Sequence, residues 1–146
     1  MEIQPFTSKQ LNNLYKIDQE CFPPGIAYTR KELARFIQHK RSKTWVALSR
    51  DQIIGFVILN QEPQMVGHIV TIDVVQSARG AGVGRALMKM AEDWARRRGL
   101  HLIYLETAEG NRLAQRFYLS RGYAKVEEIP EYYSSGETAW VMVKYL

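Results

Sequence analysis

Apolar residues recur with two different spacings along the chain, and the change from one to the other predicts a strand followed by a helix. From Val83 to Ala95 the apolar positions lie three or four residues apart, which places them on one face of an α-helix. Three arginines at 96–98 suit the negative end of that helix, and Gly99 closes it. Directly before the helix, residues 71–75 are rich in β-branched side chains and indicate a strand. We expect the rest of the chain to be arranged around this unit of strand, glycine-rich turn and helix.

Shorter segments with one or the other spacing flank this unit. Strands are expected at 2–6, 44–50, 52–60, 65–75, 101–107, 121–129 and 138–146, and further helices at 7–20, from 29 onward and at 111–120. The long helix leads back to the strand at 101–107, which predicts a parallel pair with the strand at 65–75. The sequence therefore predicts one α/β domain over residues 1–146, in which helices flank a mixed β-sheet.

The charge of the chain and its single cysteine narrow the class of protein. One cysteine, Cys21, excludes an internal disulfide, so a reducing cytoplasm is the expected location. The longest apolar run, 53–59, is too short to span a bilayer and no signal peptide is visible, so we expect no membrane partner. A net charge of +5 suits a polyanionic cofactor, but equally a nucleic-acid or ribosome surface. Because the densest basic runs, 40–43 and 96–98, fit a solvated turn and a helix end, we predict no specific nucleic acid and leave ribosome association open.

The turn before the long helix carries three alternating glycines, Gly80, Gly82 and Gly84. A backbone without Cβ atoms can approach a ligand closely, and the unpaired N–H groups of the first helical turn attract an anion. Arg79 and Arg85 flank the turn, so we expect it to bind a pyrophosphate; a turn that serves tight packing alone is the alternative. The spacing differs from the G-x-G-x-x-G of dinucleotide-binding folds, and the chain has no P-loop.

Three further residues have side chains suited to chemistry. Glu106 ends an apolar strand at the edge where ligands collect, and partial desolvation there suits a general base. Asn111 and Tyr118 are seven residues apart and so share one helix face, with Asn111 as a helix cap or a ligand contact. Taken singly, Glu106 has a surface carboxylate as its alternative, and a tyrosine placed like Tyr118 is more often a core residue than a catalytic one.

Taken together, these motifs resemble a known family. Arg79-x-x-Gly82-x-Gly84 fits Q/R-x-x-G-x-G/A, the acyl-CoA pyrophosphate loop of the GCN5-related N-acetyltransferases (GNAT). The run from Leu105 to Tyr123 is similar to the second half of that pattern, most closely in the RimI-like and archaeal or eukaryotic-type protein N-terminal acetyltransferases. The segment 132–142 and the run Glu20-Cys21-Phe22-Pro23 are similar to the same subgroup.

The resemblance implies a GNAT-like fold, acetyl-CoA as the donor and the α-amine of a protein or peptide N-terminus as the acceptor. It implies Glu106 as the base and Tyr118 as the acid, with direct transfer in a ternary complex and the Val74 N–H as an oxyanion contact. The residues expected to contact the cofactor are Ile72, Val74, Arg79, Gly80, Ala81, Gly82, Val83, Gly84, Arg85, Asn111 and Tyr118. Those expected to contact the acceptor are Phe22, Tyr28, Tyr132 and Tyr133.

Other functions remain open. The same donor site would serve an acetyltransferase for polyamines, amino acids or antibiotics. A non-catalytic acyl-CoA-binding module is disfavoured because Glu106 and Tyr118 are both present. A covalent route through Cys21 is disfavoured because no histidine lies near it in sequence, and the three scattered histidines predict no metal site. The sequence leaves the acceptor, the oligomeric state, regulation and the use of a bridging water by Glu106 undetermined.

Overall fold

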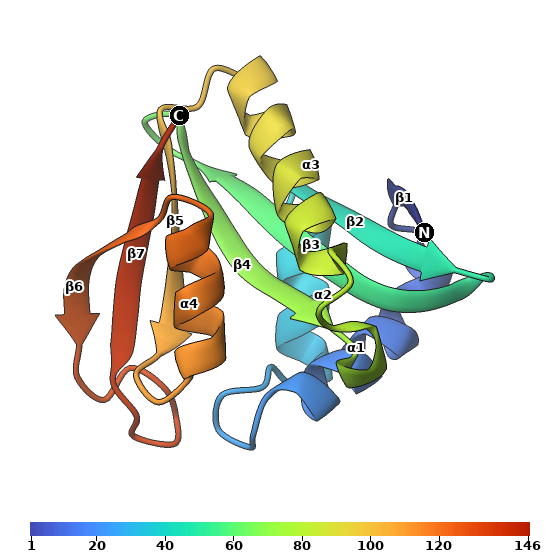
Figure 1. Cartoon of the computed structure of the whole chain (residues 1–146), viewed down its shortest axis with the longest axis horizontal. Helices are drawn as coiled ribbons and strands as arrows, with labels where there is room; N and C mark the ends of the chain where they lie inside the picture. The colour runs from blue at the N-terminus through green and yellow to red at the C-terminus, as the bar shows by residue number, and fades with distance from the viewer.

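The computed structural model describes all 146 residues as seven strands and four α-helices. Figure 1 shows how they follow one another along the chain. In chain order the elements are β1 (Glu2–Pro5), α1 (Leu11–Cys21), α2 (Arg30–Gln38), β2 (Ser42–Ser49), β3 (Gln52–Glu62), β4 (Val66–Val74), α3 (Val83–Arg97), β5 (Leu102–Ala108), α4 (Arg112–Ser120), β6 (Ala124–Ile129) and β7 (Ala139–Tyr145). No helix has both the length and the apolar character needed to cross a bilayer.

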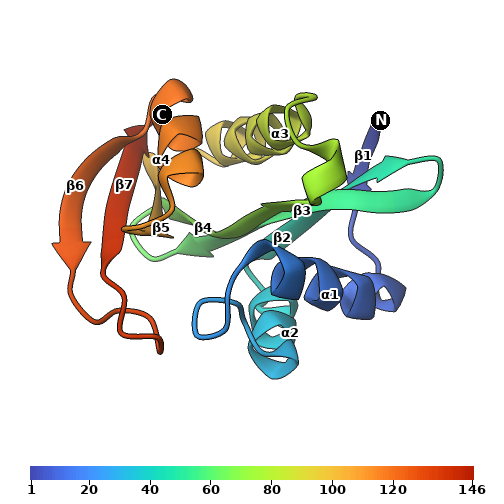
Figure 2. The same ribbon diagram turned by 60° about the horizontal axis from the view of Figure 1, so that its bottom comes forward.

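All seven strands form one sheet with the order β1-β2-β3-β4-β5-β7-β6. Every neighbouring pair is antiparallel except β4 and β5, which form the predicted parallel pair on either side of α3. Helices α1 and α2 cover one face of the sheet, and α3 and α4 lie on the other (Figure 2). The structure is therefore the expected mixed sheet between two layers of helices.

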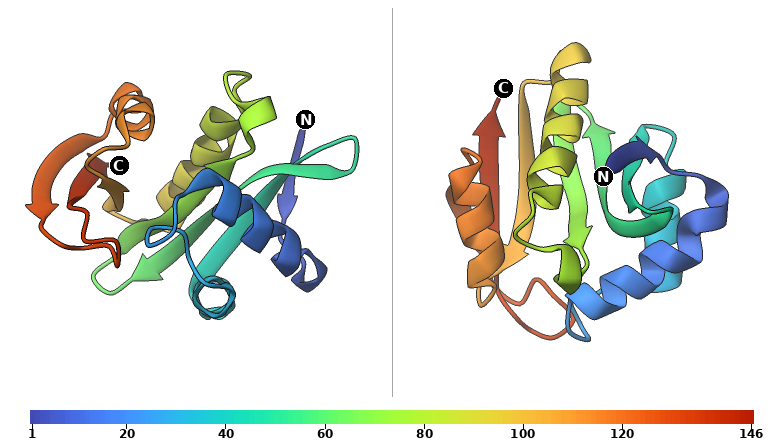
Figure 3. Two further views of the ribbon diagram at one scale, coloured as in Figure 1. Left: turned by 90° about the horizontal axis from the view of Figure 1, so that it is seen from below. Right: turned by 45° about the vertical axis from the view of Figure 1, so that its right-hand side comes forward.

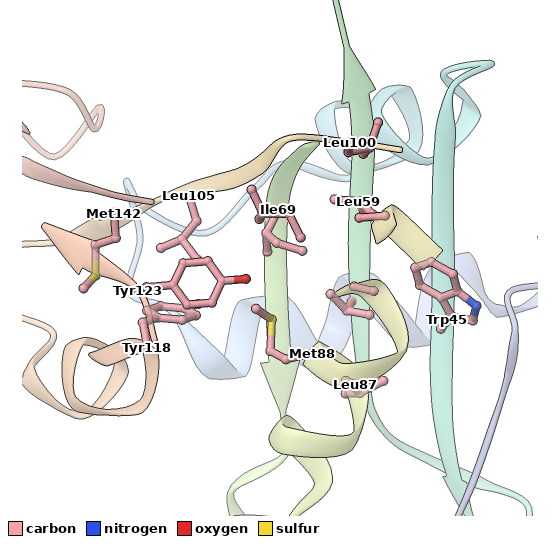
Figure 4. Close-up of a cluster of buried hydrophobic side chains, with 14 of the residues drawn as sticks. Trp45, Leu59, Ile69, Leu87, Met88, Leu100, Leu105, Tyr118, Tyr123 and Met142 are labelled. Atoms are coloured by element: carbon pink, nitrogen blue, oxygen red, sulfur yellow. The ribbon is translucent and has the colours of Figure 1, made fainter. Parts of the chain in front are cut away.

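Each face of the sheet has its own buried cluster. On the face covered by α3, Leu87 is fully buried with Ile69 of β4 and other apolar side chains (Figure 4). On the opposite face, Leu14 of α1 and Leu33 of α2 are fully buried with Phe56 of β3. Burying each such side chain contributes about 1.5–3 kcal/mol, so both helical layers are held firmly to the sheet.

Strands β4 and β5 pair only at their beginnings and then separate. Their register covers Val66 to His68 on β4, whereas β5 stays paired with β7 over its whole length (Figure 1). In the ladder between β3 and β4, Ile58 lies opposite Thr71 but Leu59 lies opposite Ile69, so Val70 is an extra residue on β4. Such a bulge bends a strand, and here it lies where β4 departs from β5. The separation opens the sheet in its middle.

Two of the predicted element ends were wrong. The helix expected from residue 7 begins with a 3-10 turn at Ser8–Gln10, and α1 itself starts at Leu11. The strand expected from Arg121 starts only at Ala124, because residues 121–123 close α4: their N–H groups donate to carbonyls of its last turn at 3.0–3.2 Å. By contrast, the N-terminal cap of α2 is as its sequence indicates, since Glu32 and Thr29 exchange hydrogen bonds.

Candidate active site

A cleft of about 810 Å³ lies where β4 and β5 separate. Its walls also include the loop between α1 and α2, the start of α3, helix α4 and the loop between β6 and β7. Of the site residues expected from the sequence, Ala81 is exposed on the glycine turn outside this lining. All the others line the cleft: Phe22, Tyr28, Ile72, Val74, Arg79, Gly80, Gly82, Val83, Gly84, Arg85, Glu106, Asn111, Tyr118, Tyr132 and Tyr133.

The N-terminus of α3 lines one end of the cleft and has the features of an anion site. Gly82 caps this helix at φ +89°, and no side chain caps the helix, so the N–H groups of its first turn are available to a ligand. A Cβ atom at Gly82 would meet no atom within 4 Å, which leaves the space in front of the turn free. Arg79 stays beside the turn because its Nε donates to the Val74 carbonyl at 3.0 Å. The turn therefore fits a pyrophosphate, as its sequence predicts.

Two of the predicted cofactor residues also have structural roles. A Cβ atom at Gly84 would lie 3.3 Å from the Phe117 ring, so this glycine lets the start of α3 approach α4 closely. Asn111 precedes α4, and its Oδ1 accepts a hydrogen bond from the Ala114 N–H at 3.2 Å, which is the helix cap anticipated as one alternative. Gly84 thus serves packing between helices, and Asn111 orients the helix that carries Tyr118.

Glu106 has a partner that the sequence analysis missed. Its Oε1 lies 2.7 Å from Nε2 of His68 on β4, and each side chain is only 12% exposed. His68 stacks on Tyr104 at 4.5 Å, and its Nδ1 lies 3.5 Å from Glu62, which accepts the Tyr104 hydroxyl at 2.6 Å. The signal that could have identified His68 is the parallel pairing, which places it opposite Tyr104, two residues before Glu106. This network fixes the carboxylate of Glu106 in the cleft.

The other end of the cleft is enclosed by two loops that touch each other. The hydroxyl of Ser134, between β6 and β7, donates to the Gly25 carbonyl, between α1 and α2, at 3.0 Å. Figure 3 (right) shows these loops meeting at one end of the molecule. The rings of Tyr132 and Tyr133 lie edge to face, and burial together with the charge of Glu106 raises both phenolic pKa values. This end of the cleft is therefore walled by neutral phenols close to the carboxylates of Glu106 and Glu137.

Tyr118 lies between the cleft and the core. Its ring packs against Phe117 and Tyr123, and Figure 4 shows it beside Tyr123. Burial raises its pKa well above the ordinary value, and the nearby Asp73 acts in the same direction. Tyr118 is therefore a neutral hydroxyl donor throughout the physiological range.

Strand β4 presents unpaired backbone donors to the cleft. Val75 donates its N–H to the Ile54 carbonyl of β3 at 3.0 Å. Because donors alternate in direction along an antiparallel strand, the N–H of Val74 points away from β3, toward the gap beside β5. The same alternation applies to Ile72. These donors can contact a carbonyl oxygen lying in the cleft.

Cys21 also lines the cleft, but its environment suppresses thiolate chemistry. Its Sγ lies 3.5 Å from the Val74 carbonyl oxygen. Burial, with a further contribution from the charge of Asp73, raises the pKa of this thiol to about 11. A thiol with such a pKa is a poor nucleophile at neutral pH, which disfavours an acetyl-cysteine route.

The comparisons with known proteins agree with this geometry. A model of the acetyltransferase (GNAT) family matches residues 11–123. An uncharacterized N-acetyltransferase of Methanocaldococcus jannaschii is 32% identical, over 99% of this chain and 91% of that protein. An N-alpha-acetyltransferase of Sulfurisphaera tokodaii is 33% identical, over 90% of this chain and 85% of that protein. The crystal structure of Ard1 from Thermoplasma volcanium has a TM-score of 0.93 at 24% identity, covering 99% of this chain and 97% of that one. The chain thus belongs to the acetyltransferase (GNAT) family and is an N-acetyltransferase whose donor is acetyl-CoA.

Proposed function

We propose that this N-acetyltransferase acetylates the α-amine of a protein or peptide N-terminus, by direct transfer in a ternary complex. The observation that carries the proposal is Glu106, which His68 holds in place and which lines a cleft whose acceptor end is enclosed by the tyrosines of two touching loops. An extended chain end fits an entrance lined by phenols, whereas a polyamine would call for more carboxylates than Glu106 and Glu137. The relative from Sulfurisphaera tokodaii, named as an N-alpha-acetyltransferase, supports the same acceptor class.

We assign the donor to the end of the cleft at the N-terminus of α3. The glycine turn, Arg79 and Arg85 would hold the pyrophosphate, and the backbone N–H groups of Ile72 and Val74 would contact the rest of the molecule along β4. When bound there, acetyl-CoA supplies the acetyl thioester. We expect the reaction to take place in the cytoplasm, because the free thiol of Cys21 suits a reducing compartment, and association with the ribosome stays a prediction.

Glu106 acts as the base in this proposal. An α-amine has a pKa of about 8, so at neutral pH it must lose a proton before it can attack a thioester. His68 occupies Oε1 of Glu106, which leaves Oε2 to accept that proton, directly or through one water. Tyr118 keeps its own proton and offers it to the leaving sulfur, while the Val74 N–H stabilises negative charge on the carbonyl oxygen.

The variant Glu106→Gln tests this assignment. We expect it to lower kcat by about 10²–10⁴ at neutral pH, because the amide cannot accept the proton, and to leave the Kd for acetyl-CoA unchanged. Glu137→Gln is the matched control, since it removes the same charge from another residue of the same cleft. If Glu106→Gln turned over as fast as Glu137→Gln, Glu106 would not be the base.

A further inference from the structure

Two carboxylates are buried side by side beneath the cleft, outside the groups assigned to catalysis. Asp18 of α1 is 0% exposed and Asp73 of β4 is 1% exposed. No basic side chain forms an ion pair with either of them. Two ionised carboxylates in such a position would repel each other at short range with little solvent to screen them. The pair therefore needs a physical explanation.

The hydrogen bonds of the pair leave one oxygen unsatisfied on each side chain. Asp18 Oδ2 accepts the N–H of Tyr28 at 2.8 Å, and Asp73 Oδ1 accepts the Thr71 hydroxyl. The remaining oxygens, Asp18 Oδ1 and Asp73 Oδ2, are both buried and neither has a hydrogen-bond partner. An ionised carboxylate only accepts hydrogen bonds, whereas a protonated carboxyl group also donates one, so a single proton held between the two groups would satisfy both of these oxygens.

We propose that Asp18 and Asp73 share a single proton and act as positioning residues. They hold the loop between α1 and α2, here called the acceptor loop, against β4. Through Asp18, the pair fixes the backbone of Tyr28, whose hydroxyl also donates to the carbonyl of Val70 at the bulge, at 3.2 Å. The ring of Tyr28 packs on Phe36 of α2. The shared proton would thus link α1 to β4, and through Asp18 it would fix the position of Tyr28 in the wall of the acceptor site.

The surroundings of the pair set its pH dependence. Burial is the main cause that raises the pKa of both carboxyl groups; the charge of Glu32 adds to the effect at Asp18, and the charge of Arg79 opposes it at Asp73. The neighbouring Cys21 and Tyr118 stay protonated in the neutral range. In the unfolded state the carboxyl groups lose their protons above the ordinary pKa of about 3.9, whereas the native pair keeps one proton up to its raised pKa. The free energy of unfolding therefore falls as the pH rises between these two pKa values.

Asp18→Asn makes the proposed bond permanent. The amide N–H can take the place of the shared proton, and the amide oxygen can still accept the Tyr28 N–H. Asp18→Ala removes both contacts and leaves Asp73 alone. Asp93→Asn is the control, because Asp93 is a partly exposed carboxylate on α3 that pairs with Lys89.

The first measurement is a titration by ¹³C NMR of protein labelled at the aspartate carboxyl carbons, with the two signals assigned from Asp18→Asn and Asp73→Asn. We expect one proton to stay on the pair at neutral pH. Titration of both carboxyl groups at their ordinary pKa of about 3.9 would overturn the proposal. Urea denaturation from about pH 5 to about pH 9 should show wild type and Asp93→Asn losing stability relative to Asp18→Asn as pH rises. If Asp18→Asn were instead less stable than wild type by the same amount at every pH, the pair would hold a bound cation rather than a proton, which would contradict the proposal.

The second measurement addresses the acceptor loop, and it rests on the proposed function. Asp18→Ala should raise KM for a peptide acceptor about tenfold, which corresponds to about 1.4 kcal/mol, and Asp18→Asn should restore it. The Kd for acetyl-CoA should not change in either variant. An equal KM for all three proteins would refute the positioning role. If wild type turned over no peptide, the proposed acceptor would fail, and the titration would still decide whether the proton is shared.

Discussion

Replacing Gly82 by valine separates the binding role of the glycine turn from its backbone conformation. Gly82 has φ +89°, where a β-branched residue is strained by about 1–2 kcal/mol. A Cβ atom at Gly82 would meet no atom within 4 Å, so the valine side chain would occupy open space beside the turn. If the valine side chain prevents two charge-assisted hydrogen bonds to the pyrophosphate, each of about 1.5–3 kcal/mol, the binding free energy of CoA falls by about 3–6 kcal/mol. The Kd for CoA should therefore rise by about 10²–10⁴.

The chain offers a closely matched control for this strain. Gly136, between β6 and β7, also has φ +89°, and a Cβ atom there would likewise meet no atom within 4 Å. Gly136→Val and Gly82→Val should therefore lower the Tm by similar amounts, about 3–8 °C, but Gly136→Val should bind CoA normally. Isothermal titration calorimetry with CoA gives the comparison. Equal CoA affinity in the two variants would refute the assignment of the pyrophosphate to this turn.

Further predictions concern three side chains in or beside the cleft, His68, Tyr118 and Cys21. His68→Phe keeps a ring against Tyr104 but removes the hydrogen bond to Glu106. The kcat should fall about 10–100-fold with no change in acetyl-CoA affinity. An unchanged kcat would show that His68 does not orient the base. Tyr118→Phe keeps the buried ring and should lower kcat about 100-fold in steady-state assays, whereas a loss confined to KM would argue against an acid role. Because the pKa of Cys21 is about 11, iodoacetamide should react about 100-fold more slowly than with a free thiol at about pH 8, and faster as pH rises. Cys21→Ser should remain active, and an inactive variant that still folds and binds CoA would revive the covalent route.

The parts of the fold that depend on local patterns could be predicted from the sequence. The spacing of apolar residues in α3 and the glycines before it define the central unit, and a capping pair marks the start of α2. The turn between β2 and β3 is also local, since Arg50 and Asp51 both have positive φ there. Each of these features involves residues that are close in sequence, so the pattern carries the information.

The parts that depend on long-range pairing could not be predicted. The contact of His68 with Glu106 requires the parallel register of β4 and β5, and the extra residue at Val70 appears only when β4 is aligned with β3. Asp18 and Asp73 meet across 55 positions of sequence (73 − 18) because α1 folds under β4, and as single acidic residues in amphipathic segments they carry no local signal. The start of β6 was misjudged because the closing turn of α4 extends three residues past the helical pattern.

The measurement that tests the central claim most directly is thiol release from acetyl-CoA with a panel of acceptors. The panel contains short peptides with different first residues, the same peptides with blocked N-termini and an internal lysine, and polyamines. We predict turnover of free N-termini alone, and the preferred first residue would then define the substrate class. Turnover confined to polyamines or lysine side chains would contradict the proposed function, and CoA binding without turnover of any acceptor would contradict the assignment of Glu106 and Tyr118 as base and acid.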